Sequence, residues 1–305
     1  MSIGEWLFAP FIEFSFMRRA LVGCLAMALG CAPIGVFLVL RRMSLMGDAM
    51  GHAILPGAAI GFLIAGLSLP AMTLGGLIAG LAVALGAGAV ARATAQREDA
   101  SFAAFYLTSL ALGVTIVSTK GSNVDLLHVL FGTVLALDNA ALLLLAAIAS
   151  ITLVALAAIY RALVVECFDP SFLKTLGGTG LFGDKGSFVH LLFLALAVLN
   201  LVGGFQALGT LMVVGIMMLP AVAARFWARE VWSMIAVAIV IAVLASMAGL
   251  LMSYHANLPT GPAIILMAGV LYGVSVLFGF HDSVFMRLIK LPHLNTHPSR
   301  EGSRS

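Results

Sequence analysis

The stretch "FLVLRRMSLMGDAMGHAILPG", residues 37–57, carries the pattern that decides the fold. An apolar run ends at a pair of arginines, Arg41 and Arg42, and a second apolar segment begins a few residues later. Apolar runs bounded by basic residues are typical of membrane-spanning helices. The second segment also contains a carboxylate, Asp48, and an imidazole, His52, which a plain membrane helix does not explain.

The composition extends this pattern to the whole chain. Of the 305 residues, 62% are hydrophobic and 10% are charged, and the mean hydropathy is +1.13. A soluble domain carries roughly a quarter charged residues. We therefore expect an all-α, polytopic membrane bundle, with one transmembrane domain over residues 1–305. The three cysteines are too few and too scattered for a disulfide framework.

The apolar runs predict about nine membrane-spanning helices, each near the length that a bilayer core requires. They cover residues 20–40, 46–66, 69–91, 101–118, 139–160, 187–203, 205–224, 231–252 and 262–280. The run 124–132 is too short to span, so we expect a re-entrant or interfacial helix there. Residues 1–17 are expected to form an interfacial segment, and residues 291–305 a disordered tail.

The basic residues predict the orientation in the membrane. One set of loops is rich in Lys and Arg, and the opposite set is poor in them. The rich set holds Arg41, Arg42, Arg92, Arg97, Arg161, Lys174, Lys185, Arg225, Arg229, Arg287 and Lys290, and the poor set holds Arg18, Arg19 and Lys120. The positive-inside rule places the rich set in the cytoplasm. Nine spans then place the N-terminus outside and the C-terminus inside.

Asp48 and His52 are candidate metal ligands. Residues four apart lie on one face of a helix, so the two side chains converge. A carboxylate oxygen and a neutral imidazole nitrogen suit a divalent ion such as zinc, manganese or ferrous iron. The same spacing also fits a mutual hydrogen bond, or an acid that reaches the cytoplasmic interface. Two ligands are an incomplete site, because zinc takes about four.

A methionine stripe offers a rival site, because thioethers suit copper(I). Met43, Met46 and Met50 share one face, and at about 100° per residue this face is opposite to Asp48 and His52. Packing on a neighbouring helix is the plainer role for this face. Gly57 and Gly61, in a small-xxx-small pattern, fall on the same side. Together with Pro56 and Pro220 they are predicted packing or hinge positions.

Histidines in the outer loops leave a further alternative open. His128 lies in the short run 124–132, and His255 lies in the loop "SYHANLPTGP". Each could contact an entering ion or a delivering partner, or could simply be a solvated interfacial residue. His190, near the start of a span, is expected to hydrogen-bond to the backbone.

The predicted cytoplasmic loop 162–185 contains a short helix. Asp169 is placed to cap it and Pro170 to begin it. An apolar side and a terminating glycine follow: Phe172, Leu173, Leu176 and Gly177. This helix either lies on the membrane surface or docks on a protein partner.

The glycine-rich stretch "GGTGLFGDKGS", residues 177–187, does not form a nucleotide site. A phosphate-binding loop needs lysine directly after its second glycine, and here Asp184 separates Gly183 from Lys185. The chain also lacks the H-E-x-x-H and G-x-S-x-G motifs. We therefore expect a protein that is not an enzyme and has no ATPase site of its own.

Four stretches together resemble the permease subunits of the ABC-type manganese/zinc/iron (ABC-3) uptake family. They are "FLVLRRMSLMGDAMGHAILPG" (37–57), "FDPSFLKTLG" (168–177), "ALGTLMVVGIMMLPAVAARF" (207–226) and "SYHANLPTGPAIILMAGVL" (253–271). The resemblance runs over nearly the whole chain in the same order. The family pattern G-D-A-[LI]-S-H-A-x-x-P-G has a common serine where this chain has Gly51.

The resemblance implies a type II ABC importer-like permease in the bacterial inner membrane. Its expected partners are a second permease protomer, a cytoplasmic ABC ATPase subunit, a periplasmic metal-binding protein and the lipid bilayer, with no nucleic acid. Asp48 and His52 would form the metal site, doubled in a dimer. The docking helix would begin at Phe168 and run to Gly177. The outer loops near 119–127 and 253–261 would face the binding protein.

The expected cargo is a divalent metal ion, with no permanently bound cofactor. We expect zinc because the site contains an imidazole, with manganese or iron as the alternative. A stand-alone secondary metal transporter is the alternative mechanism.

Overall fold

α2, Ser15–Leu40, is the helix around which the bundle is built. In its most apolar stretch 78% of the residues are buried, against 22% in α6, Glu98–Thr119. Small residues allow its neighbours to approach closely. A Cβ atom at Gly35 would lie 1.8 Å from the carbonyl oxygen of Met217 in α11, Thr210–Ala224, so only glycine fits there. Such small-residue contacts are how helices associate in a membrane.

The computed structural model describes residues 3–66, 68–94, 98–119, 134–168, 185–281 and 283–289. Within these ranges every regular element is helical, which confirms the predicted all-α bundle. The remaining helices are α1 Ile3–Glu13, α3 Met46–Ala53, α4 Leu55–Ala65, α5 Leu69–Ala93, the 3-10 turn η1 Val134–Ala136, α8 Asn139–Phe168, α10 Lys185–Leu208, α12 Val231–Ala256, α13 Thr260–Phe278 and α14 Val284–Ile289.

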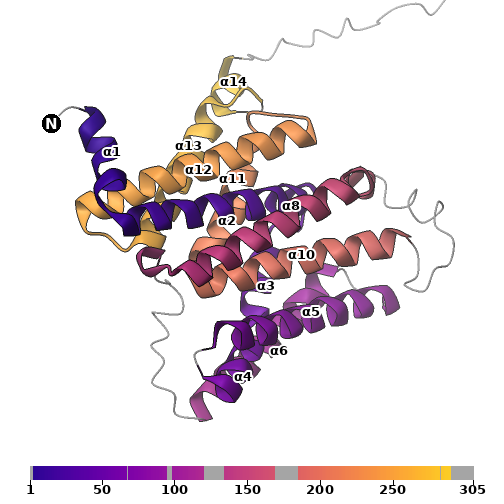
Figure 1. Cartoon of the computed structure of the whole chain (residues 1–305). Helices are drawn as coiled ribbons and strands as arrows, with labels where there is room; N and C mark the ends of the chain where they lie inside the picture. Colours follow the sequence, from indigo (N-terminus) through magenta and orange to yellow (C-terminus); the bar gives the residue numbers. More distant parts are fainter. Residues whose placement is uncertain are drawn as a thin grey trace, which may run out of the picture.

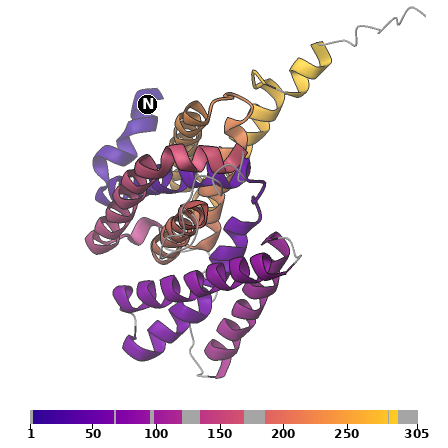
Figure 2. The same ribbon diagram turned by 90° about the vertical axis from the view of Figure 1, so that its right-hand side faces the viewer.

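The helices fall into two groups, which Figure 1 and Figure 2 show from two sides. α2, α8, α10, α11, α12 and α13 pack on one another in the larger group. α4, α5 and α6 form a smaller layer beside it, which contacts the larger group through α5 and α10. α3 lies between the groups and contacts α6, α10 and α11. The helix that carries Asp48 and His52 is therefore at the junction of the two groups.

Eight helical stretches of the described residues are long and apolar enough to cross a membrane, and α11 is a shorter ninth. A helix of 15 residues spans only about 22 Å, less than the roughly 30 Å of a bilayer core. α11 is shorter than the predicted span 205–224 because the chain is interrupted at Gly209, whose φ of 88° ends α10 at Leu208. Residues 205–208, predicted as the start of the next span, therefore belong to α10.

Other boundaries also differ from the sequence prediction. The segment predicted as one helix over 46–66 is interrupted at Ile54, between α3 and α4. α8 continues to Phe168, so the first seven residues of the predicted loop 162–185 are helical. The predicted short helix at 124–132 lies outside the described residues, as does the tail 291–305.

Candidate metal-binding site

The chain turns sharply between α2 and α3. α2 ends before Arg41, and Arg42 adopts a φ of 59°, in the left-handed region. Backbone hydrogen bonds close the turn, from Met43 N–H to the Leu38 carbonyl at 2.9 Å and from Met46 N–H to the Met43 carbonyl at 3.0 Å. α3 thus begins directly after α2, with a fixed path between them.

Asp48 and His52 lie on one face of α3, in its first and last turns. The Asp48 Oδ1 and His52 Nε2 atoms are 3.7 Å apart. This distance is too long for the mutual hydrogen bond that the sequence left open. Two atoms that each lie about 2.1 Å from a common ion can be up to about 4.2 Å apart, so the spacing suits two ligands of one metal.

The environment of the pair is half open. The Asp48 side chain is 65% exposed and that of His52 is 29% exposed. The His52 Nδ1 atom, in contrast, is buried and has no hydrogen-bond partner within the described part of the chain. Nε2 is thus the ring nitrogen available beside the carboxylate. Within the described ranges no third His, Cys, Asp or Glu joins the pair.

The methionine side of α3 is part of the protein core. Met46 and Met50 are 2% and 1% exposed. A Cβ atom at Gly51 would lie 3.4 Å from Val214 Cγ2, so the glycine side of α3 rests on α11. Met46 and Met50 are therefore packed away from the Asp48 carboxylate, which is consistent with a packing role for the stripe.

The break between α3 and α4 has two causes. Pro56 lacks the N–H that a continuous helix would donate toward the His52 carbonyl. α6 then holds the break in place, because the Ser109 hydroxyl donates a 2.8 Å hydrogen bond to the Ala53 carbonyl oxygen. Ser109 is 6% exposed. Sequence analysis did not identify Ser109, because no local motif links it to a carbonyl 56 positions earlier.

The predicted packing glycines lie where α4 and α5 come closest. A Cβ atom at Gly57 would be 2.0 Å from the Gly75 carbonyl oxygen, and one at Gly61 would be 2.5 Å from that of Ala71. Pro220 is buried within α11. α4 therefore contacts α5 backbone to backbone directly after the break.

The structure separates His255 from the candidate site. His255 lies at the end of α12, where the neighbouring Tyr254 ring is 5.7 Å from that of Phe14 beside the start of α2. Asp48 follows the other end of α2, a helix of 26 residues and thus about 39 Å long.

Some predicted site residues lie outside the described residues. They are His128 and residues 169–177, including Asp169, Pro170, Phe172, Leu173, Leu176 and Gly177. Phe168 is 72% exposed at the end of α8.

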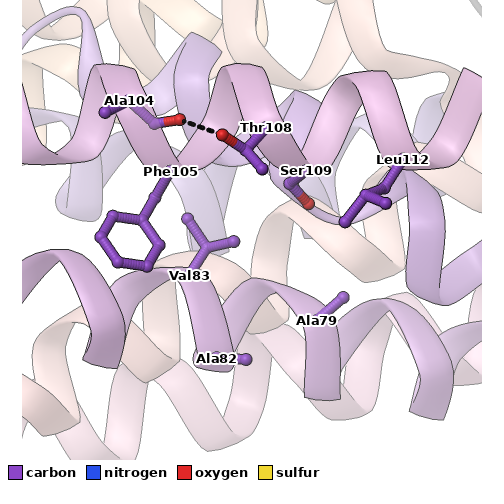
Figure 3. A pocket seen from close by; sticks show the side chains of 8 residues that line it. All are labelled: Ala79, Ala82, Val83, Ala104, Phe105, Thr108, Ser109 and Leu112. Atoms are coloured by element: carbon purple, nitrogen blue, oxygen red, sulfur yellow. Dashed lines mark hydrogen bonds between the residues drawn. The ribbon is translucent and has the colours of Figure 1, made fainter.

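A groove of about 430 Å³ lies between α5 and α6, and Figure 3 shows its walls. The lining is mostly apolar: Ala79, Ala82, Val83, Ala104, Phe105, Thr108, Ser109 and Leu112. Both hydroxyls already donate hydrogen bonds, Thr108 to the Ala104 carbonyl at 2.9 Å and Ser109 to Ala53. The groove offers no charged ligand, and neither Asp48 nor His52 lines it.

The apolar bundle and its broken helix define a multi-pass helical membrane protein with two candidate cation ligands within a span. The chain belongs to the ABC 3 transport family, whose model matches residues 13–279.

Known relatives agree with this assignment. The manganese transport system membrane protein MntC of Listeria monocytogenes is 32% identical over 267 residues, which are 88% of this chain and 92% of that protein. The chelated iron transport system membrane protein YfeD of Yersinia pestis is 29% identical over 269 residues, or 88% of this chain and 87% of that protein. The solved structure of PsaBC from Streptococcus pneumoniae in complex with Fab contains a chain that is 28% identical. The two chains superpose with a TM-score of 0.80, covering 94% of this chain and 99% of that one.

Proposed function

We propose that this chain is the membrane permease subunit of an ATP-driven importer of a divalent metal ion, manganese or iron. The observation that carries the proposal is the Asp48–His52 pair on α3, 3.7 Å apart, in a chain whose relatives include a manganese and a chelated iron transport protein. The pair holds the ion transiently on its way through the membrane.

The choice of metal follows the relatives. The preference for zinc that the imidazole suggested has no support among them, and manganese or iron fits better. Carboxylate oxygens suit manganese, and imidazole suits iron. Imidazole suits zinc as well, so the donors alone do not choose between zinc, manganese and iron.

A second permease protomer would complete the site. The described part of one chain supplies two ligand atoms, and the Asp48 side chain is 65% exposed although it lies within a predicted span. An exposed carboxylate within a membrane is costly unless a partner or a water-filled path covers it. Two copies of α3 facing each other would provide two carboxylates and two imidazoles around one ion.

The energy comes from a separate subunit. ABC permeases work with cytoplasmic ATPase subunits, and residues 168–177 would form the docking helix on this chain. A periplasmic metal-binding protein would deliver the ion to the opposite mouth, near 119–127 and 253–261. The complex would lie in the bacterial inner membrane, with the arginine-rich loops in the cytoplasm. This chain would itself hydrolyse no ATP.

Metal uptake by the reconstituted complex tests the proposal. The chain is placed in proteoliposomes with its ATPase subunit and binding protein, and the uptake of Mn²⁺ and Fe²⁺ is measured with and without ATP. We expect ATP-dependent uptake by the wild type, and loss of uptake in Asp48→Ala and His52→Ala while the subunits still copurify. His281→Ala, which alters a histidine between α13 and α14, outside the candidate site and the proposed mouth, is the matched control and should retain uptake.

Two outcomes would contradict the proposal. Uptake by the chain without an ATPase subunit or ATP would indicate a secondary transporter instead. Normal uptake by both site variants would remove Asp48 and His52 from the transport path, even if the complex transports metal.

A further inference from the structure

A partly buried ionic cluster joins the ends of three helices near α3. Arg41, which follows α2, places its Nη2 atom 2.6 Å from Glu166 Oε2 in α8 and its Nη1 atom 2.8 Å from His190 Nδ1 in α10. The same His190 nitrogen is 3.2 Å from Glu166 Oε1. We refer to these three side chains as the clasp.

The guanidinium of Arg41 is held on its edge and on its face. Its two Nη groups contact the clasp partners, and its central carbon lies 4.5 Å from the centre of the Phe193 ring. Phe193 in turn packs edge-on against Phe37 of α2, with ring centres 6.1 Å apart. A planar guanidinium that is contacted both on its edge and on its face is held in one orientation, whereas a lysine ammonium would not be. The Arg41 and Glu166 side chains are 7% and 12% exposed, so solvent screens their attraction little.

Two of the clasp residues lie near the helix ends that flank one chain segment. Glu166 lies two residues before the end of α8, and His190 lies in the second turn of α10. Residues 169–184 connect these two helices, whose adjoining ends lie on the same side of the bundle in Figure 1. Glu166 and His190 therefore lie on the two helices that flank this segment in the sequence.

The other side of the clasp leads to the candidate metal ligands. Arg41 is seven residues before Asp48, and the turn between them is closed by the Met43–Leu38 and Met46–Met43 backbone hydrogen bonds. The turn therefore has little slack to absorb a movement of Arg41. A shift of the α8 and α10 ends would move Arg41 and α3 together.

We propose that the Arg41–Glu166–His190 clasp is the mechanical link that transmits the movement of the ATPase-docking segment to the metal-binding helix α3. The three residues are positioning residues, because none of them is a proposed ligand of the ion. The inference rests on the proposed function, which assigns docking to residues 168–177. A clasp that served only to stabilise the fold would affect ATP hydrolysis and transport alike, whereas a transmitting clasp sets the ratio between them.

The test measures ATP hydrolysed per Mn²⁺ transported in proteoliposomes that contain the full complex. Glu166→Gln keeps the size of the side chain and removes its charge. We expect its ratio of ATP to Mn²⁺ to rise about threefold or more, within the range that mutations along coupling networks produce. The charge exchange Arg41→Glu with Glu166→Arg should bring the ratio back toward that of the wild type. Arg161→Ala is the matched control, because Arg161 is an exposed residue of α8, the helix that carries Glu166. This variant should leave the ratio of ATP to Mn²⁺ unchanged.

Several outcomes separate the clasp from the proposed function. Absence of ATP-dependent Mn²⁺ uptake in the wild type would overturn the proposed function and the clasp with it. If the wild type is active and Glu166→Gln has the wild-type ratio of ATP to Mn²⁺, the proposed role of the clasp is wrong and the proposed function stands. This holds even if the variant hydrolyses ATP and transports Mn²⁺ more slowly. A charge exchange that leaves the ratio raised would also overturn it. If Glu166→Gln does not assemble, His190→Gln, which keeps the Arg41–Glu166 pair, decides: a raised ratio supports the clasp, and a wild-type ratio rejects it.

Discussion

The hydroxyl of Ser109 donates a 2.8 Å hydrogen bond to the carbonyl oxygen of Ala53, across the packed faces of α6 and α3. Ala53 is the last residue of α3, and Pro56 prevents the helix from continuing unbroken into α4. One side chain on α6 thus stabilises a backbone carbonyl one residue after His52. The orientation of His52 therefore depends on α6 as well as on its own helix.

Replacement of Ser109 by alanine should weaken this junction. Interhelical hydrogen bonds of this kind contribute about 0.6 kcal/mol on average in membrane proteins and up to about 1.7 kcal/mol. We expect Ser109→Ala to lower the free energy of unfolding by about 1 kcal/mol. Equilibrium unfolding of the purified chain in mixed micelles, with increasing SDS, measures the change.

Thr108→Val is the control for Ser109→Ala. It removes a neighbouring hydroxyl that bonds only within α6, to the Ala104 carbonyl, and preserves the side-chain volume. We expect little change in stability. If both variants lose the same free energy of unfolding, the Ser109–Ala53 hydrogen bond contributes no more to stability than a hydrogen bond within α6.

The sequence predicted the helical class and most spans, because each apolar run is read locally and a bilayer core fixes its length. It also predicted that Asp48 and His52 converge, since four residues are close to one helical turn. The clasp was not predictable in this way. Arg41 and His190 are 149 positions apart, and Ser109 and Ala53 are 56 apart. Contacts of this kind depend on how helices pack, which no local periodicity encodes.

The break at Ile54 and the short α11 were missed for a related reason. A run of apolar residues has the same hydropathy whether its helix is continuous or broken. Pro56 was predicted as a packing or hinge position within one span, and prolines inside α2 and α11 leave those helices continuous. Whether a proline breaks a helix depends on which neighbours satisfy the freed carbonyls.

The Gly57–Gly75 contact predicts a severe effect for a very small change. A Cβ atom at Gly57 would lie 2.0 Å from the Gly75 carbonyl oxygen, which is backbone and cannot rotate away. Gly57→Ala should therefore separate α4 from α5 and lower the free energy of unfolding by about 1–3 kcal/mol, the usual cost of overpacking. Thermal unfolding in detergent, compared with the wild type, measures this loss.

Gly269→Ala on α13 is the matched control, because a Cβ atom there would meet nothing within 4 Å. Alanine is the better helix former by about 1 kcal/mol, so this variant should be as stable as the wild type or more so. If Gly57→Ala is equally stable, the backbone contact between α4 and α5 is not tight in the membrane protein.

The donor atoms at position 52 should control which metal the proposed site prefers. An imidazole suits zinc and iron, whereas carboxylates suit manganese. His52→Asp would leave two carboxylates one helical turn apart, Asp48 and the new one, and no nitrogen ligand. In uptake competition assays with ⁵⁴Mn²⁺ in proteoliposomes containing the full complex, we expect His52→Asp to resist inhibition by Zn²⁺ more strongly than the wild type does. The equivalent exchange at a histidine between α13 and α14, His281→Asp, should leave the inhibition by Zn²⁺ unchanged. An unaltered response to Zn²⁺ in an active His52→Asp variant would mean that the ring nitrogen of His52 does not select the ion.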